Sequence, residues 1–454
     1  MSENIKLKKG FEINLKGKAE NIISEEIKPD TFALKPSDFL GVQRGKVLVA
    51  EGDNVKAGTP LFFDKKMESV LYSSPVSGEV VEIRRGAKRK LLEVVVLPDQ
   101  VNEFEDFGKM SASDVNNLRG EEARQRILKS GVWPNIIQRP YGIVANPDDM
   151  PKSIFISGFD SHPLAPETSI LFKGEDRYFQ VGINILKKIT NGIIHLNLKA
   201  NSEVPQVFAM VQGAQVNKIA GTHPAGNVGV QIHHIDPINK GDIVWTISPY
   251  GVIQIGKLFA EGIYDASKVI ALTGSEVENP QYYKTYSGAG IKKFVTDTLT
   301  GKHNRFISGN VLTGNRVEES GHLGFYSHQI TVIPEGDYHE LFGWILPSTK
   351  KLSFHRGLGL FSFLNRKKEY ILDTNLHGEE RAFVNTGNFE KVTPMDIYPT
   401  YLLKAILAED YDEMEALGIY EVIEEDLALC EFIDVSKHHV QAIVREGIDL
   451  MING

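Results

Sequence analysis

Short apolar runs that alternate with polar residues dominate the first hundred positions. KVLVAEG, LFFD, SVLYSS, EVVEIRR and LLEVVVL occur between positions 46 and 97, separated by turns that contain Gly, Pro or Asp. Apolar positions with a period of two are typical of strands, and such turns join strands into hairpins. We therefore predict a small β-barrel within residues 1–100, followed by a polar linker over residues 99–118.

The pattern changes in the second part of the chain. Residues 121–130 have helical spacing and end at Gly131. Buried strands and amphipathic segments then alternate over Ser153–Phe159, Arg177–Ile189, Gly192–Leu198, Gln206–Gln212 and Ile243–Gly262. Alternating strands and helices predict a Rossmann-like parallel α/β domain over residues 101–265.

The last two regions differ from both. Residues 266–345 combine strand-like runs with turns rich in Gly, Asn and Thr, which predicts a small β-grasp-like domain. Residues 346–454 begin with a basic, Gly- and Phe-rich stretch and become helical from Pro394, where apolar residues recur every three or four positions. The basic stretch, Lys350 to Lys368, is predicted to be either a docking arm or an exposed loop.

Charge and cysteine content argue against several classes of function. A net charge of −9 and a pI near 5.9 argue against nucleic acid as a partner, because phosphate binding needs clustered Lys and Arg. The single cysteine, Cys430, excludes an internal disulfide and a cysteine-ligated iron–sulfur cluster. The charged N-terminus indicates no signal peptide, and no apolar run reaches the ~18 residues that a spanning helix needs. Association with a membrane would therefore require a partner.

The barrel sequence is similar to that of biotinyl and lipoyl carrier domains. In those domains a glycine follows the modified lysine by eleven positions, and Gly78 in SPVSGEV is the matching glycine here. Counting back from it leads to Met67, whereas Lys65 and Lys66 lie two positions and one position earlier. Since side chains alternate faces along a strand, a slip of one residue reverses their direction. We favour a structural barrel over a modified carrier.

A phosphate-binding loop is the first of the other candidate sites. GVIQIGKL, Gly251 to Leu258, nearly fits the pattern, but Leu258 replaces the hydroxyl residue that would hold Mg²⁺. Val252, Ile253 and Ile255 also disfavour the positive φ angles of an amide-lined loop. We predict the entrance of a helix there.

Histidines and carboxylates form two further candidates. His223, His233 and His234 lie close in sequence to Asp236, in a spacing that matches no common zinc pattern, and we predict a turn-rich structural loop. Asp160 and His162 follow the first buried strand and could form an acid–base pair, or simply a polar loop. Both segments are expected at the carboxyl edge of the sheet, where such folds bind ligands.

Segments throughout the chain resemble one family, the A subunits of the Na⁺-translocating NADH:quinone oxidoreductases. They include KGFEINLKGKAE, VAEGDNVKAGTPLFFDKK, GFDSHPLAP, THPAGNVGVQIHHIDP and VTPMDIYPTYLLKAILAEDYDEMEALGIYEVIEEDLALCEFIDVSK. One departure is Gln231 in VQIHH, where a histidine is expected, which weakens a metal site further. The resemblance implies a peripheral subunit on the cytoplasmic face of the bacterial inner membrane. The complex would oxidise NADH, reduce quinone and export Na⁺.

The resemblance also bears on partners and cofactors. It implies five other subunits, with the membrane-embedded B subunit the expected neighbour, and it raises quinone as a ligand. Flavins and iron–sulfur centres would lie on the other subunits. The fold would resemble the flavin subunit of complex I and the C subunit of the Rnf complex, including an SLBB-type β-grasp domain. Their Gly-rich flavin loop corresponds to Leu128–Ile136, which retains only Gly131 and places Trp133 there.

We therefore expect no catalytic, cofactor-binding or metal-binding residue in this chain, whose role would be structural, docking or quinone-associated. Two alternatives stay open from the sequence. One is an independent flavin- or NADH-binding oxidoreductase, which the missing G-x-G-x-x-G pattern disfavours. The other is a carrier modified at Lys65 or Lys66.

Overall fold

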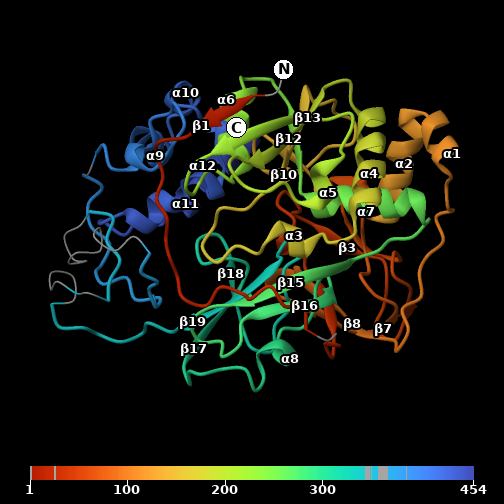
Figure 1. Cartoon of the computed structure of the whole chain (residues 1–454), viewed down its shortest axis with the longest axis horizontal. Helices are drawn as coiled ribbons and strands as arrows, with labels where there is room; N and C mark the ends of the chain where they lie inside the picture. Colours follow the sequence, from red (N-terminus) through yellow and green to blue (C-terminus); the bar gives the residue numbers. More distant parts are fainter. Residues whose placement is uncertain (1–2, 25–26, 343–347, 349, 356–366, 385) are drawn as a thin grey trace.

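The computed structural model describes residues 3–24, 27–342, 348, 350–355, 367–384 and 386–454. Figure 1 shows a central parallel sheet with helices on both sides of it. A second sheet and the N-terminal β unit lie below. The central stretch of the basic segment Lys350–Lys368 lies outside the described residues.

Two small sheets form the N-terminal barrel-like unit. One has the order β2-β8-β7-β4 and the other β3-β5-β6. In β7 the buried Gly78 and Val80 alternate with exposed residues, as the period-two pattern predicts. The strands are β2 (Phe32–Leu34), β3 (Gly45–Val47), β4 (Asn54–Val55), β5 (Pro60–Asp64), β6 (Met67–Ser73), β7 (Gly78–Arg85) and β8 (Leu91–Pro98).

The central sheet has seven strands in the order β1-β13-β12-β11-β14-β9-β10. The first five run parallel, whereas β9 pairs antiparallel with β14 on one side and with β10 on the other. The strands are β1 (Asn4–Lys6), β9 (Ile136–Arg139), β10 (Ile143–Val144), β11 (Ser153–Ser157), β12 (Ile193–Lys199), β13 (Gln215–Ala220) and β14 (Val244–Ile247). The chain proceeds from β11 to β12 and β13 and then returns to β14 on the other side of β11. The strand order therefore reverses beside β11, where such sheets bind ligands.

Helices cover both faces of this sheet. Ile154 and Ile156 of β11 share a core with α4 and α7, whereas Phe155 packs with α6 on the opposite face. This alternation follows from the period of two along a strand. The helices of this region are α1 (Ala112–Asn117), α2 (Gly120–Ser130), α3 (Thr168–Leu171), α4 (Asp176–Ile189), α5 (Gln206–Ala209), α6 (Val228–Ile235) and α7 (Pro249–Ala260).

The third region is a five-stranded mixed sheet in the order β16-β15-β19-β17-β18. Only the β15–β19 pair is parallel. Its elements are β15 (Ser267–Thr273), β16 (Gln281–Tyr286), α8 (Lys292–Val295), β17 (Asn304–Ser308), β18 (Asn315–Val317) and β19 (Gln329–Pro334).

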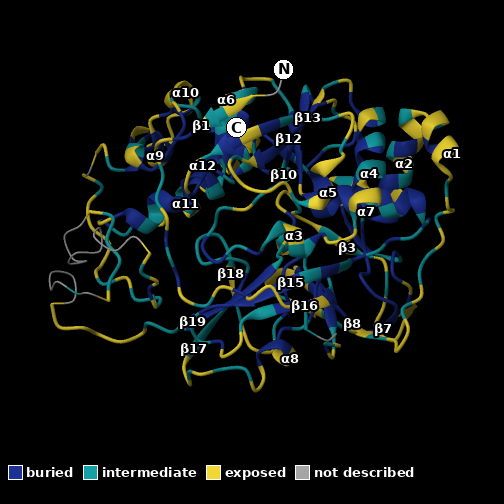
Figure 2. Cartoon of the chain, in the orientation of Figure 1, coloured by how far each residue is buried: buried dark blue, intermediate teal, exposed yellow. Residues whose placement is uncertain are grey.

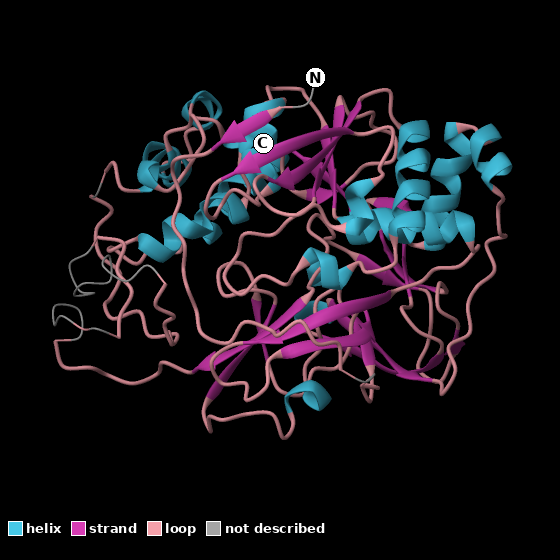
Figure 3. Cartoon of the chain, viewed as in Figure 1, coloured by secondary structure: helices cyan, strands magenta, loops and turns pink. Residues whose placement is uncertain are grey.

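The C-terminal region is helical, as the spacing of its apolar residues predicts (Figure 3). It contains α9 (Pro399–Leu407), α10 (Tyr411–Ala416), α11 (Glu424–Ile433) and α12 (Val440–Asn453). Leu402, Leu427 and Val444 share a core with Ile219 and Val230 of the central sheet region, so the two regions pack together. Across the ranges that the structure describes, the helices are all too short or too polar to cross a lipid bilayer.

Three local elements differ from the sequence-based predictions. The predicted turn-rich loop over residues 221–237 is wrong for its second half, because Val228–Ile235 forms α6 with Val230 and Ile232 buried. The predicted linker contains the short helix α1, which Ser111 caps by accepting a hydrogen bond from the backbone N–H of Asp114. Residues 4–6, included with the barrel in the sequence-based division, form β1 at the edge of the central sheet.

Candidate functional site

Polar side chains that follow β11 and β13 meet at the carboxyl edge of the parallel sheet. Nδ1 of His162 lies 2.6 Å from Oδ1 of Asp160, and Oγ of Ser161 lies 3.1 Å from Nδ1 of His223. The rings of His162 and His223 are 4.6 Å apart between centroids. The predicted Asp160–His162 pair is therefore present, and the two loops placed at this edge from the sequence are in contact.

The charges of this cluster are mutually stabilised. Desolvation by the surrounding protein would raise the pKa of Asp160, but the neighbouring His162 and its hydrogen bonds outweigh desolvation and hold the pKa at about 2. Desolvation would likewise lower the pKa of His162, yet the Asp160 carboxylate raises it above its ordinary value. Asp160 is therefore ionised at neutral pH, and protonation of His162 is favoured.

His223 is held in the neutral form. Burial and the adjacent His162 lower the pKa of His223 to about 3. Oγ of Ser161 accepts a hydrogen bond from the backbone N–H of Gly226 (2.8 Å) and shares a second hydrogen bond with Nδ1 of His223. A histidine with this pKa is a poor base for activating the Ser161 hydroxyl, so the contact does not resemble a catalytic pair.

Helix α11 closes this edge of the sheet through Arg139, which is 1% exposed. Nη1 of Arg139 donates to Oδ2 of Asp426 (2.7 Å) and Nη2 to Oε1 of Glu425 (2.6 Å). Nδ2 of Asn227 donates to the backbone oxygen of Glu425 (2.8 Å). Burial raises the pKa of Glu425, and Arg139 opposes that effect. The sequence analysis missed these four residues, whose only local signal is the acidic run that begins α11.

Five buried polar atoms around this cluster lack a hydrogen-bond partner among the described residues. They are Nε of Arg139, Nε2 of His162, Nε2 of His223, Oδ1 of Asn227 and Oδ1 of Asp426. Buried polar atoms of this kind cost free energy unless a polar molecule meets them. The cluster can therefore hold a proton between Asp160 and His162 and can bind a small polar molecule such as water.

The Asp160→Asn variant should lose a pH-dependent part of the stability. Because the pKa of Asp160 is about 2 in the folded chain against roughly 3.9 in an unfolded chain, its stabilisation is present above about pH 4 and is lost as the pH falls toward 2. The raised pKa of His162 contributes stability below its unfolded value, and this is lost as the pH rises through the folded value. Urea unfolding across pH should show both steps in the parent and neither in the variant. Identical pH profiles would contradict the pairing.

His233 and His234, the other two histidines of the segment 221–237, connect α6 to the C-terminal region. His233 accepts a hydrogen bond at Nε2 from the backbone N–H of Asp396 (2.9 Å), so its Nδ1–H donates to Oε2 of Glu421 (2.6 Å). Nε2 of His234 donates to the backbone oxygen of Pro394 (2.7 Å). Asp236 instead contacts Lys152 and Ser153. Within the residues that the structure describes, no group of three or more His, Cys, Asp and Glu side chains could hold a metal ion.

The segment Gly251–Leu258 lies inside α7, as predicted, and its glycines serve helix packing. A Cβ on Gly256 would lie 1.9 Å from the backbone oxygen of Tyr178 in α4. Nζ of Lys257 donates to Glu175 and to Asp265, both at 2.9 Å. The lysine and the glycines thus hold elements of the central domain together rather than forming a phosphate loop.

Comparisons with known proteins agree along nearly the whole chain. Three family models match: "NqrA N-terminal barrel-sandwich hybrid domain" over residues 5–99, "NqrA second alpha/beta domain" over 118–264 and "NQRA C-terminal domain" over 269–319. The A subunit of the Na(+)-translocating NADH-quinone reductase of Pasteurella multocida (strain Pm70) is 37% identical over 447 residues, which are 98% of each chain. Its counterpart in Neisseria meningitidis serogroup A is also 37% identical, over 98% of each chain.

The chain belongs to the A-subunit family of the Na⁺-translocating NADH-quinone reductases. Members of this family are subunits of an oxidoreductase that translocates Na⁺. Among solved structures, an NAD⁺-reducing [NiFe]-hydrogenase in the air-oxidized state is 10% identical with a TM-score of 0.39, covering 76% of this chain and 64% of that chain. That likeness is too weak to support an argument.

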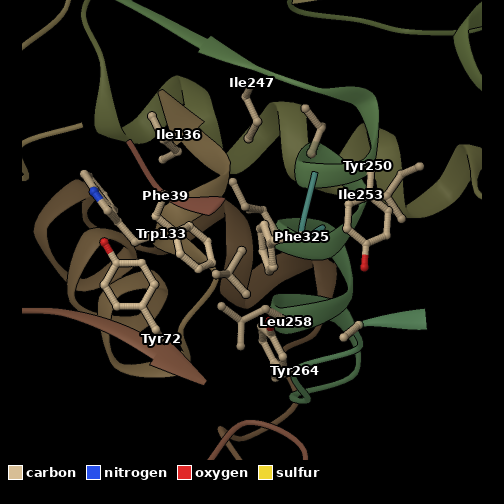
Figure 4. Close-up of a cluster of buried hydrophobic side chains, with 14 of the residues drawn as sticks. Phe39, Tyr72, Trp133, Ile136, Ile247, Tyr250, Ile253, Leu258, Tyr264 and Phe325 are labelled. Carbon is tan, nitrogen blue, oxygen red and sulfur yellow. The ribbon is translucent and has the colours of Figure 1, made fainter. Parts of the chain in front are cut away.

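The segment Leu128–Ile136, which the sequence resemblance relates to a flavin loop, is tightly packed in this chain. A Cβ on Gly131 would lie 2.2 Å from Oγ of Ser73 in the barrel. Trp133 is fully buried, donates from Nε1 to the backbone oxygen of Ala145 (2.8 Å), and lies 5.6 Å from Trp245 between ring centroids. Figure 4 shows it within a cluster of aromatic and aliphatic side chains drawn from several domains. Side chains therefore fill this position.

A narrow groove lies between the barrel and the five-stranded sheet, with a volume of about 80 Å³. Apolar side chains, among them Ile27, Phe32 and Tyr286, form much of its wall. Asn102 and the buried Thr285 also line it, and Nδ2 of Asn102 and Oγ1 of Thr285 lack a hydrogen-bond partner among the described residues. The groove is smaller than the ~300–1,000 Å³ of typical ligand pockets, so it could contact only part of a larger apolar molecule.

The lysines considered for modification lie at a hairpin tip. Lys65 and Lys66 are exposed in the turn between β5 and β6, and Met67 begins β6 opposite Asp64. Gly78 has a φ of 151° and its Cα faces the backbone of Leu97, where a Cβ would lie 1.9 Å from the oxygen. This close packing within the barrel is enough to explain why a glycine stands at position 78.

Proposed function

We propose that this chain is a docking component of a Na⁺-translocating NADH:quinone reductase and carries no redox centre of its own. It would lie on the cytoplasmic face of the membrane and hold membrane-spanning neighbours in place, with the B subunit the nearest of five partners. Membership of the family supports the proposal that this chain is part of such a complex. NADH, flavin and iron–sulfur chemistry would then belong to the other subunits.

The filled ligand positions of the central sheet support this role. Trp133 and the Gly131–Ser73 contact fill the segment that corresponds to a flavin loop. At the carboxyl edge, Asp160 and His162 are paired with each other, and Arg139 is paired with Asp426 and Glu425 of α11. The one cysteine, Cys430, is buried 3.3 Å from Oγ1 of Thr393, and burial raises its pKa, which disfavours the thiolate that a metal needs. These features favour a scaffold over an electron carrier.

The experiment that tests this role removes the chain from the purified native complex and adds it back. If the chain docks and orients its partners, Na⁺-stimulated NADH:quinone activity should fall on removal and return on addition, while flavin stays with the remaining subunits. Flavin that leaves with this chain would favour the alternative of a flavin-binding oxidoreductase. An intact mass above that of the sequence would favour the alternative of a carrier modified at Lys65 or Lys66.

We further propose that the groove at Thr285 contacts quinone. The Thr285 hydroxyl and the Asn102 amide could donate to quinone carbonyl oxygens, and Phe32 and Tyr286 would face the ring or its tail. Asn102 accepts from the backbone N–H of Ser77 through Oδ1, which directs its Nδ2 donor elsewhere. The groove thus combines the apolar wall and the donors that such a ligand requires.

Thr285→Val should weaken quinone binding by about five-fold, because it removes one hydrogen bond at constant shape. Titration of the complex with a short-chain quinone, followed by tyrosine and tryptophan fluorescence, measures the effect. Thr285→Ser keeps the hydroxyl and serves as the matched control. Equal affinities for the parent and both variants would place quinone elsewhere.

A further inference from the structure

The C-terminal region carries the net negative charge of the chain. Residues 394–454 contain 14 acidic and three basic side chains, whereas the rest of the chain contains 45 acidic and 47 basic ones. Several of these carboxylates have internal partners, such as Glu421 with His233 and Glu425 with Arg139. Others are exposed around α10, including Glu409 and Asp412. The excess of charge therefore reaches the surface.

Aromatic and apolar side chains are exposed beside these carboxylates. Tyr398 and Tyr401 are 59% and 52% exposed, and Leu407 and Tyr411 follow along the same helical segment. Leu402 and Ile406 point into the core on the opposite side of α9. Figures 1 and 2 show α9 and α10 at the periphery of the molecule, away from α1 and α2. We call this surface the α9–α10 face.

A hollow of about 500 Å³ adjoins the α9–α10 face at Tyr411. Glu446 and Asp449 of α12 line it together with the ring of Tyr411. Asp449 is 3.7 Å from Nη1 of Arg445, which already bonds Glu424 and the backbone oxygen of Tyr141. Arg445 therefore neutralises these carboxylates only in part. An aromatic ring beside two carboxylates is a favourable environment for a Lys or Arg side chain.

We propose that the α9–α10 face and its hollow dock a Lys- and Arg-containing cytoplasmic segment of a membrane-spanning subunit of the same complex. This inference rests on the proposed function, and it names the surface and the chemistry of the partner. Loops of membrane proteins on the cytoplasmic side carry an excess of Lys and Arg, which complements the charge of this region. The exposed tyrosines would supply the apolar contact area that is typical of interfaces.

Charge reversal in the intact complex tests the surface. The double variant Glu409→Lys, Asp412→Lys should associate about ten-fold more slowly at low salt with membranes that hold the other subunits, because electrostatic steering is reversed. Tyr401→Ala should speed dissociation. The control Glu203→Lys, Glu319→Lys reverses two exposed carboxylates on other domains and should behave as the parent. Association is measured with the tagged full chain on membranes that lack it, over a range of salt concentrations.

The outcomes separate this inference from the proposed function. If the parent and all variants associate equally, the α9–α10 face is not the docking surface, but the proposed docking function stands. A parent chain that does not associate with these membranes at all overturns both. Binding of the parent to protein-free anionic vesicles, or its dimerisation through this face, also overturns the proposed partner. Slower association of the acidic-face variant alone supports the inference.

Discussion

Replacement of Arg139 by methionine is expected to lower the free energy of unfolding by about 3–5 kcal/mol. The guanidinium is the internal partner of Asp426, which is 2% exposed, and also of Glu425. Methionine fills a similar volume but leaves buried carboxylates without a cation. Hydrogen exchange should show that α11 loses protection first, because Arg139 joins it to β9.

Arg316→Met is the matched control for this change. Arg316 lies 3.8 Å from Glu318, and both side chains are largely exposed. Exposed pairs contribute at most about 1 kcal/mol, so the control should unfold close to the parent. If Arg139→Met is equally harmless in urea, the ion pairs at the carboxyl edge do not hold the helical region in place.

Replacement of Trp133 by alanine should cost about 3–5 kcal/mol, because it leaves a cavity among well-packed side chains and removes a buried hydrogen bond. The indole is fully buried against Trp245, and its Nε1–H donates to Ala145. Thermal unfolding followed by calorimetry measures the loss. Phe342→Ala, at a residue 56% exposed, is the control and should change little.

The same variant tests how this chain differs from flavin-binding subunits. Because the Gly131–Ser73 contact and the ring of Trp245 also fill this position, Trp133→Ala should be less stable yet still colourless after incubation with flavin mononucleotide. Tight flavin binding by the unaltered chain would show that the position is open.

Local periodicity explains why much of the fold is predictable from the sequence. The helix Arg177–Ile189 and the strand Gly192–Leu198 recur almost unchanged as α4 and β12, since each pattern determines its own buried face. Helix α6 was missed because Gly229 and the preceding Pro224 and Gly226 resemble a turn-rich segment. Its helical state depends on the burial of Val230 and Ile232, which is a tertiary property.

The sequence predicted the candidate site only where the order of the strands brings its residues together. Asp160 and His223 follow parallel strands, so their meeting at one edge follows from the strand order. The bond between Arg139 and Asp426 joins positions 287 residues apart, and no local pattern connects them. The groove at Thr285 likewise arises where two domains meet, and its polar atoms become distinctive only through burial.

We propose that this chain holds its complex together without carrying electrons. The decisive measurement is an anaerobic titration of the purified full-length chain with NADH, recorded as an absorption spectrum, alongside the same titration of the native complex. We predict flavin and iron–sulfur absorbance changes in the complex and none in the isolated chain. A reducible chromophore that remains with the isolated chain in stoichiometric amount would contradict the claim and assign redox chemistry to this chain.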